Sequence, residues 1–451
     1  MIPGVKGVDE RYGAAPFLTK TLRYVFPDHW SFLLGEIALY SFVVLVGTGI
    51  YLTLFFEPSL AETTYRGSYA PLHGFEMTEA YASALKLSFD VDAGLLMRQV
   101  HHWAANVFVV AIVLHLLRIF FTGAFRKPRD ITYYVGLTLL MVALLEGFIG
   151  YSLLDDLLSG MGLAIAYGVA ESVPVIGANL ALLLWGGEYP GADAFISRLY
   201  IAHVLLLPVL IGTLIAIHLL LVSLTKHGQF RERGKTERNV TGTPMWPAYA
   251  LRSIGLGLAV AAAIFALGGL IQINPIWLWG PFETGLSTNG AQPDWYMGWL
   301  IGALRLVPGF DVTIGDYTLI PNPFWGGVLF PGLVFAFLYA YPWLERRLRG
   351  DRDRHHLLDR PRDAPVRTAT GMALLSLIAL VLFFGAADRL YVQSGLPYDS
   401  QLWIFRGLLV VLPIAVFLLT RKVCLELRAN ELRPVLGETG DPSTRKPEEA
   451  G

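Results

Sequence analysis

Eight apolar stretches run through the chain, and each is long enough to cross a membrane. They lie near residues 32–56, 100–121, 131–154, 201–225, 254–273, 324–344, 368–387 and 402–420. Crossing about 30 Å of hydrocarbon takes about 20 apolar residues in a helix. Backbone groups in lipid must be hydrogen-bonded within the segment, which favours helices. The sequence therefore predicts an all-α, polytopic membrane protein with eight transmembrane helices.

Composition supports this prediction. Hydrophobic residues make up 54% of the 451 residues and charged residues only 16%, against about 25% charged residues in a soluble domain. The net charge of −1 favours no charged partner, and we expect no nucleic-acid binding. The single cysteine, Cys424, excludes a disulfide within the chain, and without a CxxCH motif conventional c-type haem attachment is excluded as well.

Loop charges predict the orientation. The loops after the second, fourth and sixth stretches are rich in Arg and Lys, whereas the opposite loops hold few. By the positive-inside rule both termini face the cytoplasm. We expect a cytoplasmic segment (1–30), a four-helix bundle (31–245), two further helices with a loop (246–345), two last helices (346–426) and a disordered tail (427–451).

Four histidines lie inside these stretches at matched spacings. His101 and His115 are 14 residues apart, and His203 and His218 are 15 apart. A helix turns about 100° and rises about 1.5 Å per residue, so each pair returns to roughly one face about 21–22 Å further along. Facing helices would offer two bis-histidine haem sites, His101 with His203 near the outer face and His115 with His218 near the inner face. His102 falls about 140° from His115 and should face elsewhere.

A lone histidine in a spanning helix can also bond a neighbouring helix, but four at matched depth favour haem. Glycines repeat the same 14-residue period and would leave room at the haem edges, although they also serve helix packing. Two arginines lie three residues from a histidine, where they suit haem propionates. These residues are Gly35, Gly49, Gly136, Gly150, Arg98 and Arg118.

Four segments of the chain carry motifs of one known family. They are RQVHHWAANVFVVAIVLHLLRIFFTGAFRKPRDITYYVG around the first histidine pair, GYSLLDD from Gly150, SRLYIAHVLLLPVLIGTLIAIH around the second pair, and QPDWYMGWLIGALRLVP from Gln292. Together these segments resemble the cytochrome b family of cytochrome bc complexes. The resemblance covers roughly residues 30–423, with the first four helices forming a dihaem bundle. The paired Asp155 and Asp156 and the WGGEYPG insert look most like the actinobacterial branch, and the 15-residue spacing is also that of the photosynthetic and Gram-positive branch. The resemblance thus implies a protein of the bacterial plasma membrane.

The resemblance implies a quinol:cytochrome c oxidoreductase subunit that contributes to proton translocation. Quinol would be oxidised near the outer face. One electron would pass to a Rieske iron–sulfur partner, the other through two b-type haems to a quinone near the cytoplasm. The implied partners are a dihaem cytochrome c, a haem-copper oxidase in a supercomplex and a second copy of the complex. The chain lacks a Cys/His set for an iron–sulfur cluster.

The resemblance also assigns site residues. Asp294 would accept the quinol proton, with Tyr296 as its hydrogen-bond partner. Relatives more often carry Glu there, and the Asp variant favours menaquinol. Without the resemblance, Asp294 would read as the cap of the following short helix. The remaining residues expected in the outer pocket are Pro293, Trp295, Gly160 and Glu146, and Glu146 would either relay protons or pair with a neighbour.

The chain departs from the family pattern in four places. Leu154 stands where relatives usually have Pro, and Leu33 replaces the cysteine that binds an extra haem, so we expect no covalent haem. Ser223 and Ser253 replace the inner-site His and Asp of mitochondrial relatives. Nearby residues suited to an inner quinone site are Lys226, His227 and Arg252, although a solvated cytoplasmic face predicts the same residues.

Two other functions remain open from the sequence. A dihaem, quinone-reactive membrane anchor of a dehydrogenase would share the four histidines but would not need four extra helices or the Asp294 loop. A haem-free transporter would explain neither the histidine spacing nor the PDWY segment (293–296).

Overall fold

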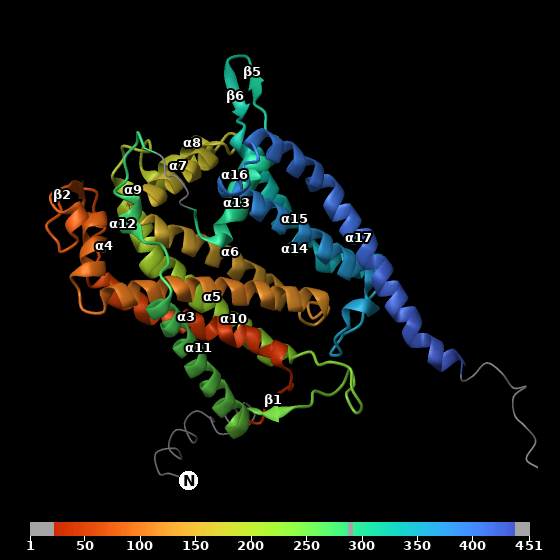
Figure 1. Cartoon of the computed structure of the whole chain (residues 1–451). Helices are drawn as coiled ribbons and strands as arrows, with labels where there is room; N and C mark the ends of the chain where they lie inside the picture. Colours follow the sequence, from red (N-terminus) through yellow and green to blue (C-terminus); the bar gives the residue numbers. More distant parts are fainter. Residues whose placement is uncertain (1–21, 287–291, 438–451) are drawn as a thin grey trace, which may run out of the picture.

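The computed structural model describes residues 22–286 and 292–437 (Figure 1). These residues include eight helical segments that are long and apolar enough to cross a membrane, which confirms the predicted number. The helices that carry these segments are α3 (Leu33–Thr53), α5 (Gly94–Phe121), α6 (Asp130–Ser152), α10 (Leu207–Thr225), α11 (Ala250–Leu270), α14 (Phe330–Arg349), α15 (Pro365–Phe384) and α17 (Tyr398–Gly437).

Helices α3, α5, α6 and α10 form a bundle whose centre is closely packed. Contacts join α3 to α5, α5 to α6 and α6 to α10, while α11 packs on α3 and α5. Each of the four helices contributes to one buried cluster, made of Ala38, Phe108, Ala111, Ala143 and Ile211. Without a hydrophobic force between helices in lipid, association depends on close van der Waals contact, which small residues such as alanine allow. The cluster lies at mid-height, because Phe108 is halfway between His101 and His115 on α5.

A five-residue π-helical segment, η3 (Ala202–Leu206), joins α9 (Ala194–Ile201) to α10. A π-helix bonds i to i+5 and so accommodates one additional residue per turn. His203 lies inside this segment. The irregularity explains how a 15-residue spacing on this helix can match the 14-residue spacing on α5.

A second group of helices packs beside the bundle. Helix α13 (Trp295–Leu306) contacts α15, and α15 contacts α17. Their shared buried cluster includes Ala303, Leu306, Val381 and Phe384. A hairpin of β5 (Val312–Ile314) and β6 (Tyr317–Ile320) projects from this group at the top of Figure 1. This arrangement fixes the position of residue 294, which directly precedes α13.

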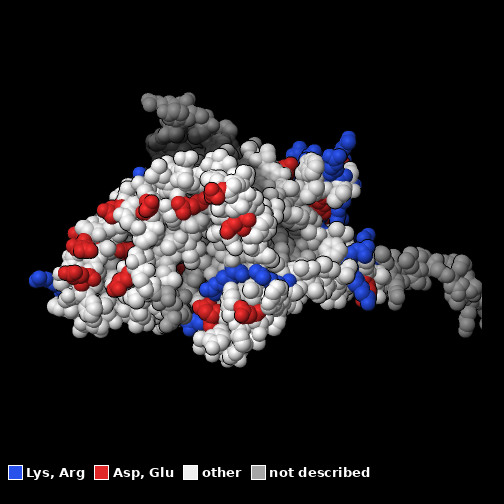
Figure 2. Space-filling model, turned by 90° about the horizontal axis from the view of Figure 1, so that it is seen from above, with Lys and Arg blue, Asp and Glu red and all other residues white. Residues whose placement is uncertain are grey.

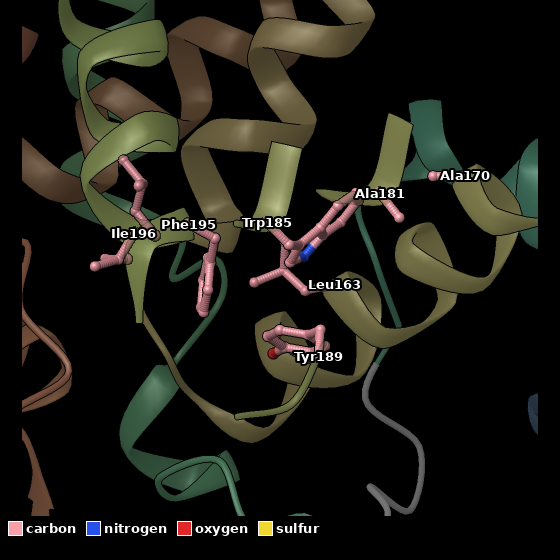
Figure 3. Close-up of a cluster of buried hydrophobic side chains, with 8 residues drawn as sticks. Leu163, Ala170, Ala181, Trp185, Tyr189, Phe195 and Ile196 are labelled. Carbon is pink, nitrogen blue, oxygen red and sulfur yellow. The ribbon is translucent and has the colours of Figure 1, made fainter. Parts of the chain in front are cut away.

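The long connections at the His101 end form an ordered layer. It holds α4 (Glu79–Phe89), α7 (Leu157–Glu171), α8 (Gly177–Trp185) and α12 (Ile276–Trp279). Figure 3 shows its buried core, where Trp185, Tyr189 and Phe195 gather around Leu163. The remaining short elements are β1 (Val25–Phe26), β4 (Thr243–Pro244), β2 (Glu62–Thr64), β3 (Glu76–Thr78), η1 (Trp30–Phe32), η2 (Ala70–Leu72), η4 (Met245–Tyr249), η5 (Trp325–Leu329), η6 (Pro361–Asp363) and α16 (Ala387–Ser394).

Charged residues divide between the two ends of the molecule. In Figure 2, Asp and Glu dominate the left half of the visible face, and many Lys and Arg gather towards the right, where the chain leads into its grey C-terminal trace. Helix α17 runs on to Gly437, beyond residue 427 where we predicted a disordered tail. Residues of high helix propensity, such as Arg428, Ala429 and Glu431, lie in the first part of this stretch, and Glu431 bonds Arg360 at 2.8 Å and Arg362 at 3.0 Å. Residues 438–451 lie outside the described part of the chain.

Arg367 is the centre of a buried ion cluster. Its guanidinium group donates to Glu345 at 2.8 Å and to Asp359 at 3.0 Å, and the side chain is 0% exposed. We expect Arg367→Met to destabilise the folded chain by about 3 kcal/mol, because Glu345 and Asp359 lose the fully buried cation that joins them and keep only ion pairs such as those with Arg349 and Arg126. Thermal unfolding of the purified protein in detergent measures this. Exposed Arg352→Met is the control, and equal melting temperatures for the two variants would contradict the expectation.

Candidate functional site

Two pairs of histidine rings face each other inside the bundle. The ring centres of His101 and His203 are 6.1 Å apart, and those of His115 and His218 are 6.4 Å apart. Two imidazoles bound to opposite sides of one metal ion through bonds of ~2 Å have their ring centres about 6 Å apart. The structure therefore pairs the residues as the spacing predicted, at a separation that fits one iron between each pair.

Each of the four period-matched glycines lies against one of these rings. A Cβ built on the glycine would lie between 2.5 and 3.4 Å from the ring's Cε1 atom. The contacts join Gly35 to His115, Gly49 to His101, Gly136 to His218 and Gly150 to His203. The closest is at Gly150, where any larger residue would displace the His203 ring. The shared spacing of the glycines and histidines therefore places one glycine against each histidine ring.

The Nδ1 atoms of the histidines have different surroundings. The Nδ1 of His101 lies 2.9 Å from the hydroxyl of Thr48, which itself donates to a backbone carbonyl and can accept the imidazole hydrogen. A hydrogen on Nδ1 leaves the Nε2 lone pair free for a metal. The Nδ1 of His203 lies 3.0 Å from Glu146. Among the described residues, the buried Nδ1 atoms of His115, His203 and His218 have no hydrogen-bond partner, so the approach of Glu146 to His203 is a close contact and not an aligned hydrogen bond.

Arg98 and Arg118 carry nitrogens without partners close to the histidines. Arg98 is 6% exposed, and its Nη1 donates to Asn274, yet its Nε and Nη2 atoms have no hydrogen bond within the described residues. The guanidinium of Arg118 lies 4.1 Å from the ring centre of Phe32, and its buried Nε is likewise unpaired in the described part of the chain. Buried donors are normally satisfied, so both side chains fit an anionic group such as a haem propionate.

A cavity of about 550 Å³ opens beside the first histidine pair. Its walls come from α3, α5, α6, α10 and the segment before α13, and they include both histidines of the pair. Its volume falls in the range of small-molecule sites, about 300–1,000 Å³, and such sites are mostly apolar with a few convergent polar groups. Here the polar groups include Arg98, His102, Glu146, Asp294 and Tyr296.

Asp294 lies in this cavity at the start of α13, between two hydrogen-bond donors. The Nε2 of His102 is 2.7 and 2.9 Å from the two carboxylate oxygens, and the Tyr296 hydroxyl donates at 2.9 Å. Burial alone would raise the pKa of Asp294, but the charge and hydrogen bond of His102, with bonds from Tyr296 and Asn106, outweigh it and hold the pKa below its ordinary value. The carboxylate is therefore ionised at neutral pH.

Three residues that the resemblance assigned to the outer pocket do not line this cavity. Pro293 and Trp295 flank Asp294, and the Trp295 side chain is 39% exposed. Gly160 lies on α7, where an added Cβ would meet the ring of Phe282, and its carbonyl accepts from Tyr189. Glu146, Asp294 and Tyr296 are brought together, whereas Gly160 supports the packing of the loop layer.

The acidic pair after α6 anchors the loop layer. Asp155 accepts from the Thr78 hydroxyl at 2.8 Å, and Asp156 accepts from the Leu158 backbone to cap α7. Burial raises the pKa of each carboxyl to about 6. A carboxyl whose pKa is raised by folding binds protons that the unfolded chain releases, so the folded state loses stability as the pH rises from about 4 to about 6.

We expect Asp155→Asn to remove part of this loss. An amide oxygen can still accept from Thr78 but carries no charge to bury. The variant should therefore be more stable than the natural chain at about pH 7, by on the order of 1–3 kcal/mol, and nearly equal to it at about pH 4. Melting temperatures of both proteins across this range provide the test, and a difference that does not change with pH would contradict it.

The three residues suited to an inner quinone site differ in their surroundings: His227 is packed among aromatic rings, whereas Arg252 is exposed. His227 packs among the rings of Tyr24, Phe26 and Phe32, and burial with the charges of Arg118 and Arg129 lowers its pKa to about 3. Lys226 ends α10. The Arg252 side chain is 70% exposed and lies 3.6 Å from Asp28, which agrees with a solvated face.

Comparison with known proteins connects this geometry to a family. The family model described as cytochrome b(N-terminal)/b6/petB matches residues 106–281. The cytochrome bc1 complex cytochrome b subunit of Streptomyces coelicolor is 45% identical over 429 residues, which are 95% of this chain and 78% of the relative. That of Mycobacterium tuberculosis is 47% identical over 425 residues, 94% and 77% of the two chains. The chain belongs to the family of cytochrome bc1 complex cytochrome b subunits.

A solved structure shows the same fold. The chain of a hyperthermophilic respiratory Complex III superposes with a TM-score of 0.67 at 20% identity, over 93% of this cytochrome b and 98% of that chain. The predicted family and the polytopic helical architecture are both confirmed. The Streptomyces and Mycobacterium relatives agree with the predicted resemblance to the actinobacterial branch.

Two polar residues of this cytochrome b were missed from the sequence. His102 was set aside as facing away from the haem, and its contact with Asp294 spans 192 positions. Glu36 on α3 hydrogen-bonds both Tyr249 and Ser253 near the start of α11. A signal for Glu36 existed, since an acid inside a spanning helix is a functional candidate by default. No local sequence pattern indicated the contact between His102 and Asp294.

Proposed function

We propose that this cytochrome b oxidises quinol in the cavity beside His101 and His203, and that this end of the bundle faces outward. The observation that carries the proposal is that the Asp294 carboxylate lines the same cavity as the two histidines. Quinol oxidation releases protons and electrons together, so a proton acceptor and an electron acceptor must both lie within reach of one substrate molecule.

Asp294 is the proposed proton acceptor. Its lowered pKa keeps the carboxylate ionised and able to accept a hydrogen bond from a quinol hydroxyl. The same low pKa lets the proton leave readily towards the outer water. The Tyr296 hydroxyl and His102 hold the carboxylate in position. The Asp at this position, where relatives more often carry Glu, supports menaquinol as the substrate.

Two b-type haems fit the two histidine pairs, and when bound they supply reversible one-electron transport between the two faces. In this proposal His101 and His203 hold the outer haem through Nε2, and His115 and His218 hold the inner one. Arg98 and Arg118 would bind the propionates through their unpaired nitrogens. The four glycines leave space beside the rings.

The electron balance requires partners. Each quinol becomes quinone, two protons and two electrons. One electron goes to a Rieske iron–sulfur protein, whose cluster needs cysteine or histidine ligands that this one-cysteine chain does not provide. The other crosses the membrane to a quinone near Lys226 and His227, which takes up protons from the cytoplasm. We further propose a dihaem cytochrome c subunit, a dimeric complex and association with a haem-copper oxidase.

Electron delivery by quinol tests the proposal. The oxidised native complex is mixed with a menaquinol analogue, and absorbance of b-type haem and of cytochrome c is followed. We expect quinol alone to reduce both, with faster turnover than with a ubiquinol analogue. Reduction of b haem only by a dehydrogenase substrate would contradict the proposal and favour a dihaem membrane anchor.

A further inference from the structure

One of the four proposed haem ligands has a carboxylate beside it. Glu146 on α6 lies one helical turn before Gly150, so both residues lie against the His203 ring. The Oε1 atom of Glu146 is 3.0 Å from Nδ1 of His203. The approach is oblique, so the contact is a close charge interaction rather than an aligned hydrogen bond. Thr48 takes the corresponding place beside His101 but carries no charge.

The Glu146 side chain lies against His203 and lines the cavity that also holds Tyr296. Its side chain is only 17% exposed, and its other oxygen, Oε2, is buried without a hydrogen-bond partner among the described residues. In the described part of the chain, no Lys or Arg forms an ion pair with it. An acid inside a spanning helix is costly, and one that stays without a cation nearby requires a functional explanation.

The second histidine pair lacks any such group. Within the described residues, the Nδ1 atoms of His115, His203 and His218 all have no hydrogen-bond partner, but only His203 has an acid within ion-pair distance. A carboxylate on the outer nitrogen of a metal-bound histidine makes that ligand more basic. A more basic ligand and a nearby negative charge both favour the more positive, oxidised iron. In a low-dielectric interior this charge effect is large.

We propose that Glu146 is a positioning residue that lowers the reduction potential of the haem held by His101 and His203, relative to that of the haem held by His115 and His218. Its carboxylate lies beside Nδ1 of His203 and, with haem bound, its negative charge would stabilise the oxidised iron at this site. With haem bound at both pairs, the first site would therefore give up an electron more readily than the second. The inference rests on the proposed function, because it requires haem at both pairs.

Redox titration of the Glu146→Gln variant in the native complex is the test. Glutamine keeps the size of the side chain and its acceptor oxygen but removes the charge. At a fixed potential we expect the ratio of reduced to oxidised haem at the first site to rise at least tenfold, which is a midpoint shift of about 59 mV for one electron. The second site should titrate as before. Absorbance and electron paramagnetic resonance distinguish the two haems.

Two controls separate charge from packing. Thr48→Val removes the neighbour of His101 without changing any charge, and we expect a much smaller shift. Glu36→Gln removes an acid that is bonded to Tyr249 and Ser253 near the other end of the bundle. That variant should leave the midpoint of the first site unchanged.

Different outcomes overturn different statements. Two haems with an unchanged first midpoint in Glu146→Gln would overturn this inference, including the case in which turnover falls and Glu146 serves the quinol proton instead. If Gln does not retain the first haem, Glu146→Met gives the same comparison. Failure of both neutral variants to bind haem, with Glu146→Asp binding it, would also overturn the inference. Absence of a haem from the natural first site would contradict the proposed function itself.

Discussion

Replacing Asp294 with alanine is expected to slow quinol oxidation at least a hundredfold while both b haems remain bound. A positioned acid or base contributes about 10²–10⁴-fold to a proton-transfer step, and Asp294 is the ionised carboxylate in the cavity that His102 and Tyr296 hold in place. Alanine removes the acceptor without touching a histidine of either pair. Quinol:cytochrome c reductase activity of the purified native complex measures the rate, and absorbance measures the haem.

The matched control is Asp316→Ala, which removes an exposed acid from the turn between β5 and β6. We expect this variant to retain full activity. Turnover of Asp294→Ala at the natural rate, with its haem retained, would show that Asp294 is not the proton acceptor and would favour the membrane-anchor alternative. Loss of haem in Asp294→Ala would show that the residue supports the fold of the cavity.

Removing one ligand from the first histidine pair is expected to remove one haem and leave the other. In His101→Ala or His203→Ala, the haem content should fall from two to one per chain, because the 6.1 Å separation of the rings requires both imidazoles to hold one iron. The remaining spectrum should be that of the inner site. The pyridine haemochrome assay gives the content, and a redox titration shows which midpoint is missing.

The neighbouring His102→Ala is the control for this prediction. Its ring bonds Asp294 and takes no part in either pair, so both haems should remain while quinol oxidation slows. A His101→Ala protein that keeps two haems would rule out His101 as a ligand. If His101→Ala instead removes only the haem at His115 and His218, the assignment of His101 to the first pair is contradicted.

The sequence predicted the membrane architecture and the pairing of the histidines for one physical reason. Apolar segments that cross lipid form helices, because their backbone groups must be hydrogen-bonded within the segment. In a helix, the number of residues between two positions determines whether they lie on the same face. His101 and His115 illustrate this, since 14 residues return to one face of a regular helix. The 15-residue spacing of His203 and His218 was harder to interpret, because the π-helical segment that absorbs the extra residue has no clear signature in the sequence.

The polar contacts of the cavity and of the bundle could not be predicted from local sequence patterns. His102 reaches Asp294 across 192 positions, and Glu36 reaches Ser253 across 217. Such contacts depend on how helices and long loops pack, which a period of 3.6 residues does not encode. For the same reason Gly160, placed in the outer pocket by resemblance, lies instead against Phe282 in the loop layer.

The central claim is that the two histidine pairs hold two b-type haems that connect the faces of the membrane. The most direct measurement is the haem content and redox titration of the purified chain in its native complex, followed by absorbance. The account predicts two b-type haems per chain with separate midpoints. A chain without haem, or with only one, would contradict it and reopen the haem-free transporter as an explanation of the eight helices.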